Sequence, residues 1–564
     1  MAWTQPLDPC HNMLLSCLVA ILPVSLIFWA LVVRKIKGYQ ASLLATGAAL
    51  LIAVVVYRMP PTLALLSAAN GALYGLFPIC WIVFTAVFLF NSTIKSGQFE
   101  VIRGFMAGIT ADRRIQALLI AFSFGSFLEG TAGFGAPVAI TAAMLTGLGF
   151  NPLYAAGICL IANTAPVAFG SIGIPVTVAA QVTSLPEHAI SQMIGRTLPF
   201  LSALLPFYLV ILMAGFKKAK EVAPAALVSG LSFALIQFVT ANYLGPALPD
   251  VLAGIGSILS LLIFLRFWQP RSVWRFPGEA PPPTPVATSA RRGSEAKSDR
   301  SAANARPGPP AIAASRLLWA FSPFIVLTLM VITWGLAPVK DWLTAHGTLQ
   351  FAFPGLHNAI QDHNGPVPHI FRFNYLSAAG TAIFLAALIS LPISRLSPKQ
   401  GLELLQSTLR QLRFPILSIA VVLAFAYLMN DSGITPTIAH SLADTGVLFP
   451  FFAPILGWLG VFITGSDTSS NALFGKLQSA TATSIGVDPI VTVGANVSGG
   501  VIGKMISPQS IAVAAAAGGL VGRESDLFRF TVKHSLILLF IICCIVLAQA
   551  YVFKWMIPTY IHHL

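Results

Sequence analysis

Three ionisable side chains stand inside stretches of this sequence that are otherwise apolar: Glu129, Asp467 and Lys504. A charge placed at the centre of an apolar span costs about 2.5–3.5 kcal/mol, so residues of this kind usually face a cavity and carry function. Lys504 is predicted to be the counter-ion of an anionic ligand, and the alternative is a structural salt bridge to Glu129 or Asp467. Glu129 and Asp467 are the predicted proton-coupling residues, because burial in a low-dielectric site favours the neutral carboxyl. A helix N-cap is the competing interpretation of Asp467.

Glycines, prolines and hydroxyl residues accompany these charges in four clusters. The clusters are FLEGTAGFGAPVAI at 127–140, NTAPVAFGSIGIP at 163–175, TGSDTSSNALFG at 464–475 and GANVSGGVIGKMISPQS at 494–510. Glycine lets the chain turn sharply and approach a ligand, and Pro137 can restart a helix whose electropositive N-terminus suits an anion. The predicted substrate-binding residues are Gly130, Thr131, Gly133, Gly135, Asn163, Thr164, Ser171, Ser466, Thr468, Ser469, Ser470, Asn471, Asn496, Lys504 and Ser507. Close packing of helices through small residues is the alternative for any single glycine.

The composition indicates where these clusters must lie. Of 564 residues, 56% are hydrophobic and only 9% are charged, against roughly 25% charged in soluble proteins, and the mean hydropathy is +0.81. Apolar runs long enough to cross a bilayer recur along the chain. The spans are predicted near residues 12–33, 41–57, 70–92, 153–180, 197–215, 223–243, 251–268, 317–337, 374–392, 414–430, 488–515 and 535–555. The chain is therefore predicted to be an all-α polytopic membrane protein with about 12 transmembrane helices.

Two further apolar segments, 116–147 and 447–483, are broken in the middle by glycine and polar residues and are predicted to be re-entrant hairpins. Their surroundings match in order: NSTIKSGQ with NDSGITP, FLEGTAG with FITGSDT, GFNPLYAAG with GVDPIVTVG, and FGSIGIPVTVAA with IGKMISPQSIAVAA. Under the topology that the basic residues indicate, the first repeat begins with an outside-to-inside span and the second with an inside-to-outside span, so the repeats are inverted. Interrupted helices at matching positions of inverted repeats indicate a secondary transporter and the place where its substrate binds.

Orientation follows from the basic residues, because loops rich in Lys and Arg stay in the cytoplasm. Such residues gather around 34–37, 95–114, 217–220, 266–316, 395–413 and 523–533. Twelve crossings with both termini outside place all of these segments in the cytoplasm. The net charge of +14 is thus a topology signal, and no nucleic-acid partner is inferred.

The chain is expected to divide into two membrane halves. Residues 269–316, rich in Pro, Ala, Ser and Arg, cannot bury enough apolar surface to fold and are predicted to form a disordered cytoplasmic linker. The N-terminal half then covers 1–268 with hairpin 116–147, and the C-terminal half covers 317–564 with hairpin 447–483.

Motifs for other classes of chemistry are missing from the sequence. There is no HExxH, no GxSxG and no CxxC pair, so neither an enzyme nor a metal site or cofactor is predicted. His357, His363 and His369 fall in one outer loop with loose spacing and are read as solvated loop residues. A channel and a transport-linked sensor remain open as alternatives to a carrier.

The motifs together resemble the L-lactate permease family over nearly the whole chain apart from the linker. Besides the four clusters, the similarity includes DPxxN (Asp8, Pro9, Asn12) and KIKGY at 35–39. The resemblance implies uptake of L-lactate, often also D-lactate and glycolate, with a proton across the lipid bilayer of a bacterial plasma (inner) membrane.

The hairpin arrangement is also similar to the wider ion transporter superfamily, whose dicarboxylate carriers use an elevator motion and hold carboxylate and Na+ at polar hairpin tips. Thr468–Asn471 resembles those tips. A small 2-hydroxymonocarboxylate is an anion at pH 7, and one proton or one Na+ would cancel its charge. The sequence leaves open the coupling ion, the preferred hydroxy acid, and whether the protein is a monomer or a homodimer.

Overall fold

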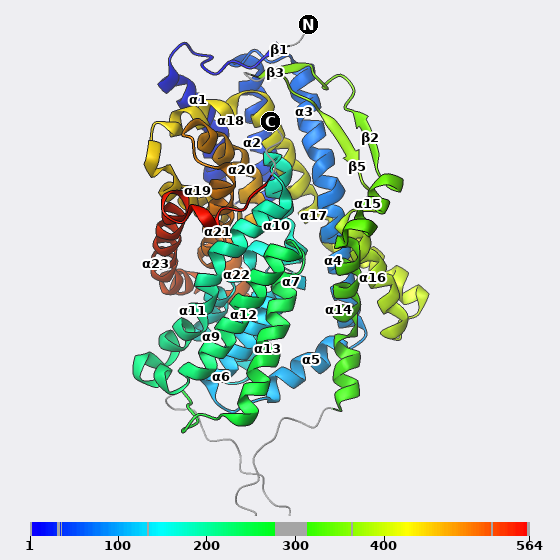
Figure 1. The fold of residues 1–564 in the computed structure, drawn as a ribbon, viewed down its shortest axis with the longest axis vertical. Coiled ribbons are helices and arrows are strands. Elements are labelled where there is room, and N and C mark those ends of the chain that lie inside the picture. The colour runs from blue at the N-terminus through cyan, green and yellow to red at the C-terminus, as the bar shows by residue number, and fades with distance from the viewer. Residues whose placement is uncertain are drawn as a thin grey trace, which may run out of the picture.

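Helices that follow the long axis of the molecule form most of the protein (Figure 1). The structure is a computed structural model that describes residues 3–30, 34, 36–131, 133, 135–276, 313–362, 365–520 and 523–560. In these residues nine helices are long and apolar enough to cross a membrane, or ten if the bent pair Pro152–Ala162 and Val167–Thr183 is one span. The chain is thus a multi-pass helical membrane protein, as its composition predicted. The count of twelve spans stays a prediction.

The elements of the N-terminal half match the predicted apolar segments. They are α1 (Met13–Phe28), α2 (Gly38–Val55), α3 (Pro61–Tyr74), the π-helical turn η2 (Gly75–Cys80), α4 (Trp81–Lys95), α5 (Gln98–Gly108), α6 (Arg113–Ala117), the π-helical segment η3 (Leu118–Phe124), α7 (Gly125–Thr131), α8 (Ala136–Gly147), α9 (Pro152–Ala162), the 3-10 turn η4 (Val167–Phe169), α10 (Gly170–Thr183), α11 (Glu187–Glu221), α12 (Ala223–Tyr243) and α13 (Pro249–Phe267).

The C-terminal half is also mainly helical and contains four of the five strands, the fifth being β1 near the N-terminus. Its helices are α14 (Ala314–Gly335), α15 (Ala337–His346), α16 (Ala379–Ile393), α17 (Pro398–Asp431), α18 (Ile434–Ala443), η6 (Gly446–Leu448), α19 (Phe449–Thr464), α20 (Asp467–Ser484), α21 (Pro489–Gly503), η7 (Lys504–Ile506), α22 (Pro508–Gly518), α23 (Glu524–Tyr551) and η8 (Lys554–Met556). The strands are β1 (Trp3–Thr4), β2 (Leu349–Ala352), β3 (Ile360–Asp362), β4 (Gly365–Pro366) and β5 (Ile370–Phe373).

In Figure 1, strands β1 and β3 lie at the upper end of the molecule, and β2 and β5 lie somewhat lower on the right-hand side. Strand β1 pairs in parallel with β3, which pairs with β4, while β2 and β5 form an antiparallel pair. This loop also overturns one sequence prediction, because His369 is buried and its Nε2 lies 3.0 Å from Oδ2 of Asp431 instead of in solvent. His357 is half-buried, and His363 lies outside the described residues.

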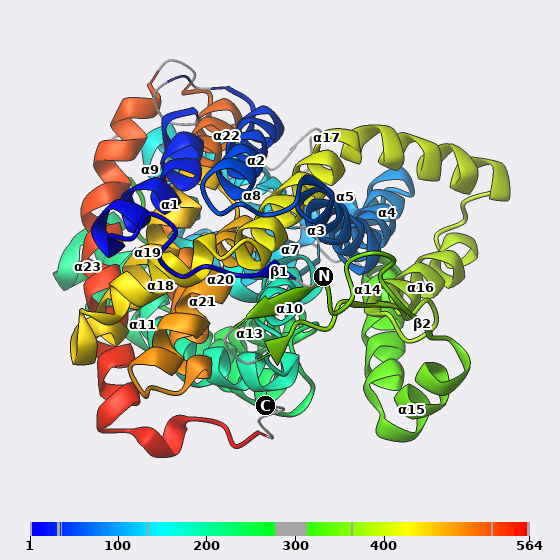
Figure 2. The same ribbon diagram turned by 90° about the horizontal axis from the view of Figure 1, so that it is seen from above.

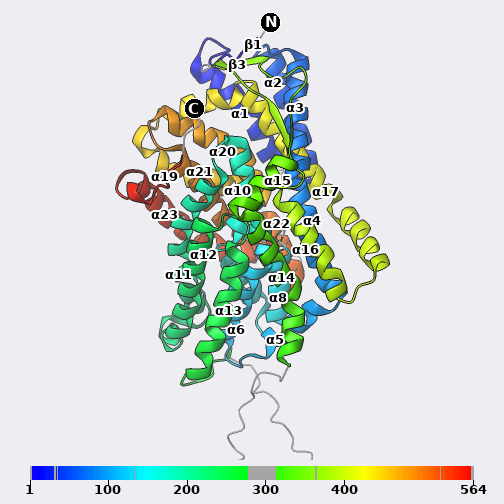
Figure 3. The same ribbon diagram turned by 45° about the vertical axis from the view of Figure 1, so that its right-hand side comes forward.

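Both interrupted segments are broken in their middle, and they run from opposite ends of the molecule. The first consists of α6, η3, α7 and α8, and the second of α19 and α20. Figures 1 and 3 place α6 near the lower end and α20 near the upper end. This opposed arrangement is what an inverted repeat requires. That the two segments are re-entrant in a bilayer stays a prediction.

The base of the first hairpin is fixed by a buried ion-pair network. Arg114 lies 2.7 Å from Asp112 and 2.9 Å from Glu221 at the end of α11. Trp274 joins this network through its backbone N–H, which donates to Oδ2 of Asp112. The first residues of the predicted linker, 269–276, are therefore ordered against the hairpin base. Most of that linker, 277–312, lies outside the described residues.

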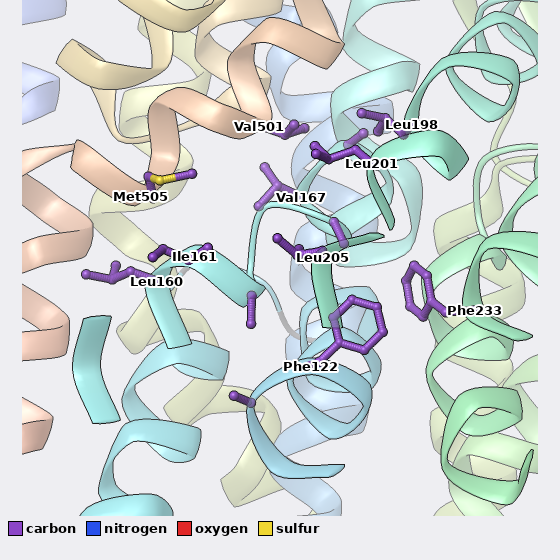
Figure 4. Close-up of a cluster of buried hydrophobic side chains, with 14 of the residues drawn as sticks. Phe122, Leu160, Ile161, Val167, Leu198, Leu201, Leu205, Phe233, Val501 and Met505 are labelled. Atoms are coloured by element: carbon purple, nitrogen blue, oxygen red, sulfur yellow. The ribbon is translucent and has the colours of Figure 1, made fainter. Parts of the chain in front are cut away.

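The two halves of the chain share one hydrophobic core. In Figure 4, Val501 of the second half lies near Val167 and Leu201 of the first, and Phe122, Phe233 and Met505 belong to the same cluster. A second group of helices, α4, α14 and α16, packs together on one side of the molecule, away from α11, α19 and α23 (Figures 2 and 3). The halves are thus intermingled in space although the linker separates them in sequence.

Candidate functional site

Lys504 and Glu129 meet in the interior of the protein. Glu129 lies in α7, near the tip of the first hairpin. Lys504 is the first residue of the 3-10 turn η7, which separates α21 from α22. The Nζ atom of Lys504 lies 3.0 Å from Oε1 of Glu129, and the two side chains are 10% and 2% exposed. Oε2 of Glu129 is buried without a partner in the described residues. The ion pair is therefore complete on one carboxylate oxygen only.

A cavity opens beside this pair where the four predicted clusters converge. Its volume is about 70 Å³. Since one water needs roughly 10–15 Å³ of such space, the cavity suits a ligand the size of about five waters. It is lined by Glu129, Gly135, Val167, Gly170, Ser171, Ile174, Pro175, Gly465, Ser466, Asp467, Thr468, Lys504, Gln509, Ser510 and Val513.

Asp467 brings a second carboxylate to the cavity. The N-cap of α20 is Ser466, whose Oγ accepts from the backbone N–H of Ser469, so Asp467 is not the cap but a first-turn residue. Asp467 is buried, and neither of its oxygens accepts a hydrogen bond from any residue that the structure describes. The ammonium of Lys504 lies within electrostatic reach. One cation thus faces two carboxylates at this site.

Broken backbone forms the wall opposite the hairpin tips. Ser171, Ile172 and Gly173 have φ of 48°, 60° and 77°, a left-handed run that costs of order 1–3 kcal/mol for each residue with a side chain. A Cβ added at Gly133 would lie 1.9 Å from Oγ of Ser171, so the first hairpin and this break are in direct contact. This run lies inside α10, and a separate break at residues 163–166 bends the α9–α10 pair by 62°.

Asn471 and Asn496, which the sequence predicted as ligands, do not line the cavity and are hydrogen-bonded to other groups of the protein. The Nδ2 of Asn471 donates to the carbonyl oxygen of Pro175 (3.1 Å), and Nδ2 of Asn496 donates to Oδ1 of Asn471 (2.8 Å). The Nε2 of Gln478 continues the chain to Oδ1 of Asn496 (3.3 Å). All three amides are fully buried. They hold α10, α20 and α21 in register around the site.

The remaining predicted residues divide by position. Those lining the cavity are Glu129, Gly135, Ser171, Ser466, Asp467, Thr468 and Lys504. Those placed behind or beside it are Gly130, Thr131, Gly133, Asn163, Thr164, Ser469, Ser470, Asn471, Asn496 and Ser507. Several hydroxyls in the second group bond to backbone carbonyls of their own hairpin or helix; for example, Ser470 donates to Gly457.

Gln509 and Ser510 line the cavity but were not predicted. They follow Pro508, which starts α22, and their position in the first turn of a restarted helix is the signal that could have found them. A Cβ added at Gly465 would lie 2.3 Å from Oε1 of Gln509, so this side chain packs on the tip of the second hairpin.

Comparison with known proteins gives a consistent set of relatives. A family model described as L-lactate permease matches residues 16–553. An L-lactate permease of Bacillus subtilis is 52% identical over 99% of this chain and 100% of its own length. The glycolate permease GlcA of Escherichia coli is 50% identical, with the same coverage, and an L-lactate permease of Escherichia coli is 47% identical, again with that coverage.

Among solved structures, the YdaH transporter of Alcanivorax borkumensis matches 87% of this chain and 89% of its own, with 11% identity and a TM-score of 0.44.

Proposed function

This chain belongs to the L-lactate permease family, and from that membership we propose that it carries L-lactate, and also D-lactate and glycolate, into the cell together with a proton. Relatives named for L-lactate and for glycolate, each near half identical over the full chain, support this substrate class. The proposed location is the bacterial plasma (inner) membrane, with both termini outside.

The observation that carries the proposal is the Lys504–Glu129 pair inside a cavity of small-molecule size. A 2-hydroxymonocarboxylate is ionised at pH 7, so its carboxylate competes with Glu129 for the ammonium of Lys504. A buried carboxylate that has lost its only cation is costly. Glu129 therefore takes up a proton when the substrate displaces it.

This exchange accounts for a one-to-one coupling. In the empty site Lys504 is neutralised by Glu129, and in the loaded site it is neutralised by the substrate while Glu129 is a neutral acid. The charge of the pair and its ligand is the same in both states. An interior-negative potential would oppose an unaccompanied anion by about 2.3 kcal/mol per 100 mV, and the proton removes that opposition.

An elevator-type motion is the proposed route across the membrane. The two hairpins reach one cavity from opposite ends, and the group α4, α14 and α16 borders them along one side, where Phe127 of α7 packs on Phe324 of α14 with ring centroids 4.7 Å apart. In this proposal the hairpins and the broken helices α9–α10 and α21–α22 move together against that group. Each hairpin then covers the substrate from one side.

The test is transport by the purified protein in proteoliposomes under an imposed pH gradient with Na+ absent. Saturable uptake of L-lactate, D-lactate and glycolate, with alkalinisation of the outer medium, is expected. Uptake that requires Na+ would show that sodium, and not the proton, is the coupling ion. A flux that does not saturate would indicate a channel.

Glu129→Gln separates coupling from binding. Because this variant holds no titratable group at position 129, we expect it to lose pH-driven uptake while lactate-for-lactate exchange at equal pH continues. An unchanged dependence on the pH gradient would refute Glu129 as the coupling group and direct attention to Asp467.

A further inference from the structure

Asp250 is a buried acid that the proposed exchange does not use. It is the second residue of α13 and is 1% exposed. Both of its carboxylate oxygens are buried without a hydrogen-bond partner among the described residues. Such a group is tolerated in an apolar interior as a neutral acid, because an ionised carboxylate that is buried without a paired cation is costly. Asp250 therefore holds a proton in this state.

The tip of the first hairpin packs directly on Asp250. A Cβ added at Gly130 would lie 2.8 Å from Cβ of Asp250 and 2.8 Å from the backbone nitrogen of Val251. Gly130 follows Glu129 in sequence, so no side chain separates the hairpin backbone at this point from the first turn of α13. Asp250 and Glu129 lie within electrostatic reach of one another.

The groups that face Asp250 are few. From α7 the only ionisable one is Glu129, whose Oε1 is paired with Lys504 and whose Oε2 is unpartnered. From α12 the amide of Gln237 comes near, and its Nε2 also donates to the carbonyl oxygen of Ala165 (3.1 Å); this amide is polar but does not titrate. The adjacent segments α10 and η3 carry no ionisable residue. Glu129 is thus the one acid in these neighbouring elements with which Asp250 can share a proton.

We propose that Asp250 exchanges the coupled proton with Glu129 and so forms a second station on the proton path to the cavity. The inference rests on the proposed proton symport. When the substrate takes Lys504, the O–H bond of Asp250 breaks and an O–H bond forms on Glu129. Asp250 is left as a carboxylate and regains a proton from water at the α12–α13 loop, residues 244–248, which the charge pattern places outside.

A purely structural role is the competing explanation, because an acid in the first turn of a helix is favourable to the helix dipole. The two roles differ in what they do to exchange. Lactate-for-lactate exchange at equal pH needs no net proton movement, whereas pH-driven accumulation needs it in every cycle. A variant that keeps the fold but cannot hold the proton should lose only the second activity.

The experiment compares Asp250→Asn with wild type in proteoliposomes, with lactate as the probe. The rate of pH-driven uptake is expected to fall about 100-fold, the low end of what a positioned proton-transfer group contributes, while exchange at equal pH stays near wild type. Asp250→Glu, which restores the carboxyl, should recover pH-driven uptake with a shifted pH profile. Because Asp250→Asn is close to isosteric but its folding is not assured, Asp250→Glu keeps the proposal testable.

Asp488→Asn is the matched control. Asp488 caps α21 by accepting from the backbone N–H of Ile490 (3.0 Å) and also accepts from Tyr560 (2.6 Å), and asparagine can make both contacts. Both activities should survive in this variant.

Two results would overturn the inference: wild-type pH-driven uptake in Asp250→Asn, or an equal loss of uptake and exchange in Asp250→Asn that Asp250→Glu does not reverse. Failure of wild type itself to move a proton with lactate would instead refute the proposed symport.

Discussion

Lys504 has two carboxylates within reach and a hydrogen bond to only one of them. Removing one partner of a buried ion pair leaves an uncompensated charge, which costs about 3–5 kcal/mol. A substrate carboxylate supplies that compensation, so binding and proton uptake become parts of one exchange. The same reasoning joins the two sequence interpretations of Lys504. In the proposed exchange, Lys504 forms a salt bridge with Glu129 when the cavity is empty and is the counter-ion of the substrate when the cavity is loaded.

Lys504→Ala is expected to abolish lactate uptake because it removes the only cation that lines the cavity among the described residues. The free energy of unfolding should fall by up to about 3–5 kcal/mol while Glu129 remains charged. Adding Glu129→Gln should restore the stability but not the transport. Uptake assays and thermal unfolding in detergent measure the two effects, and wild-type uptake by Lys504→Ala would exclude a role in binding.

The cost of burying charge was enough to single out Glu129, Asp467 and Lys504 from the sequence. Asp250 was not predicted as a functional residue because it lies at the end of a loop, where aspartate commonly begins a helix. Asn471 and Asn496 were predicted as ligands because the sequence shows polar residues in an apolar segment but not which way they point. The structure turns them toward each other.

At the scale of elements, the apolar runs predicted the helices well and their bends less well. Every predicted span coincides with a helix or a broken pair of helices. Hydropathy does not show where a helix bends. The left-handed turn at Ser171–Gly173 was therefore indicated only by the small residues and prolines in the middle of the span. The strands were missed because they are two to four residues long and lie in a loop that looked solvated.

The pairing of His369 with Asp431 ties the strand-bearing loop to the end of α17. Burial disfavours the imidazolium, but the hydrogen bond and charge of Asp431 outweigh it with help from nearby carbonyls, and the pKa of His369 is raised from 6.5. A raised pKa in the folded state means that this contact stabilises fully below the unfolded value. The stabilisation is lost as the pH rises through the folded value.

His369→Gln is therefore expected to loosen residues 365–373 in acid and to have little effect in alkali. Hydrogen bonds to charged groups contribute about 1.5–3 kcal/mol. At about pH 5.5 the free energy of local opening of this segment should therefore fall by that amount in the variant. Hydrogen exchange of this segment, compared with wild type at two pH values, measures it. An equal loss of protection at both pH values would show that the charge on His369 plays no part.

The whole molecule has its strands at one end and the ordered start of the linker at the other (Figure 1). Strand β1 pairs with β3 at the strand-bearing end, and Tyr560, the last described residue, bonds to Asp488, the cap of α21. The opposite end holds Arg114 and Trp274. The charge pattern predicts that the end with the strands faces outward.

Single cysteines in a cysteine-free variant test this orientation. Gln350→Cys, in exposed strand β2, should react with a membrane-impermeant thiol reagent on intact cells, whereas Arg103→Cys in α5 should react only after lysis. The reverse pattern would invert the proposed topology and with it the side from which Asp250 is reprotonated.

The core common to both halves has a bearing on ancestry. Phe122 and Phe233 bury their rings in the same cluster as Val501 and Met505 (Figure 4), so neither repeat alone would cover its apolar surface. A half-length forerunner could have covered that surface only against a second copy inserted upside down. Gene duplication and fusion would then have made that antiparallel partnership permanent, and the two copies became free to diverge, one keeping the glutamate and the other the lysine.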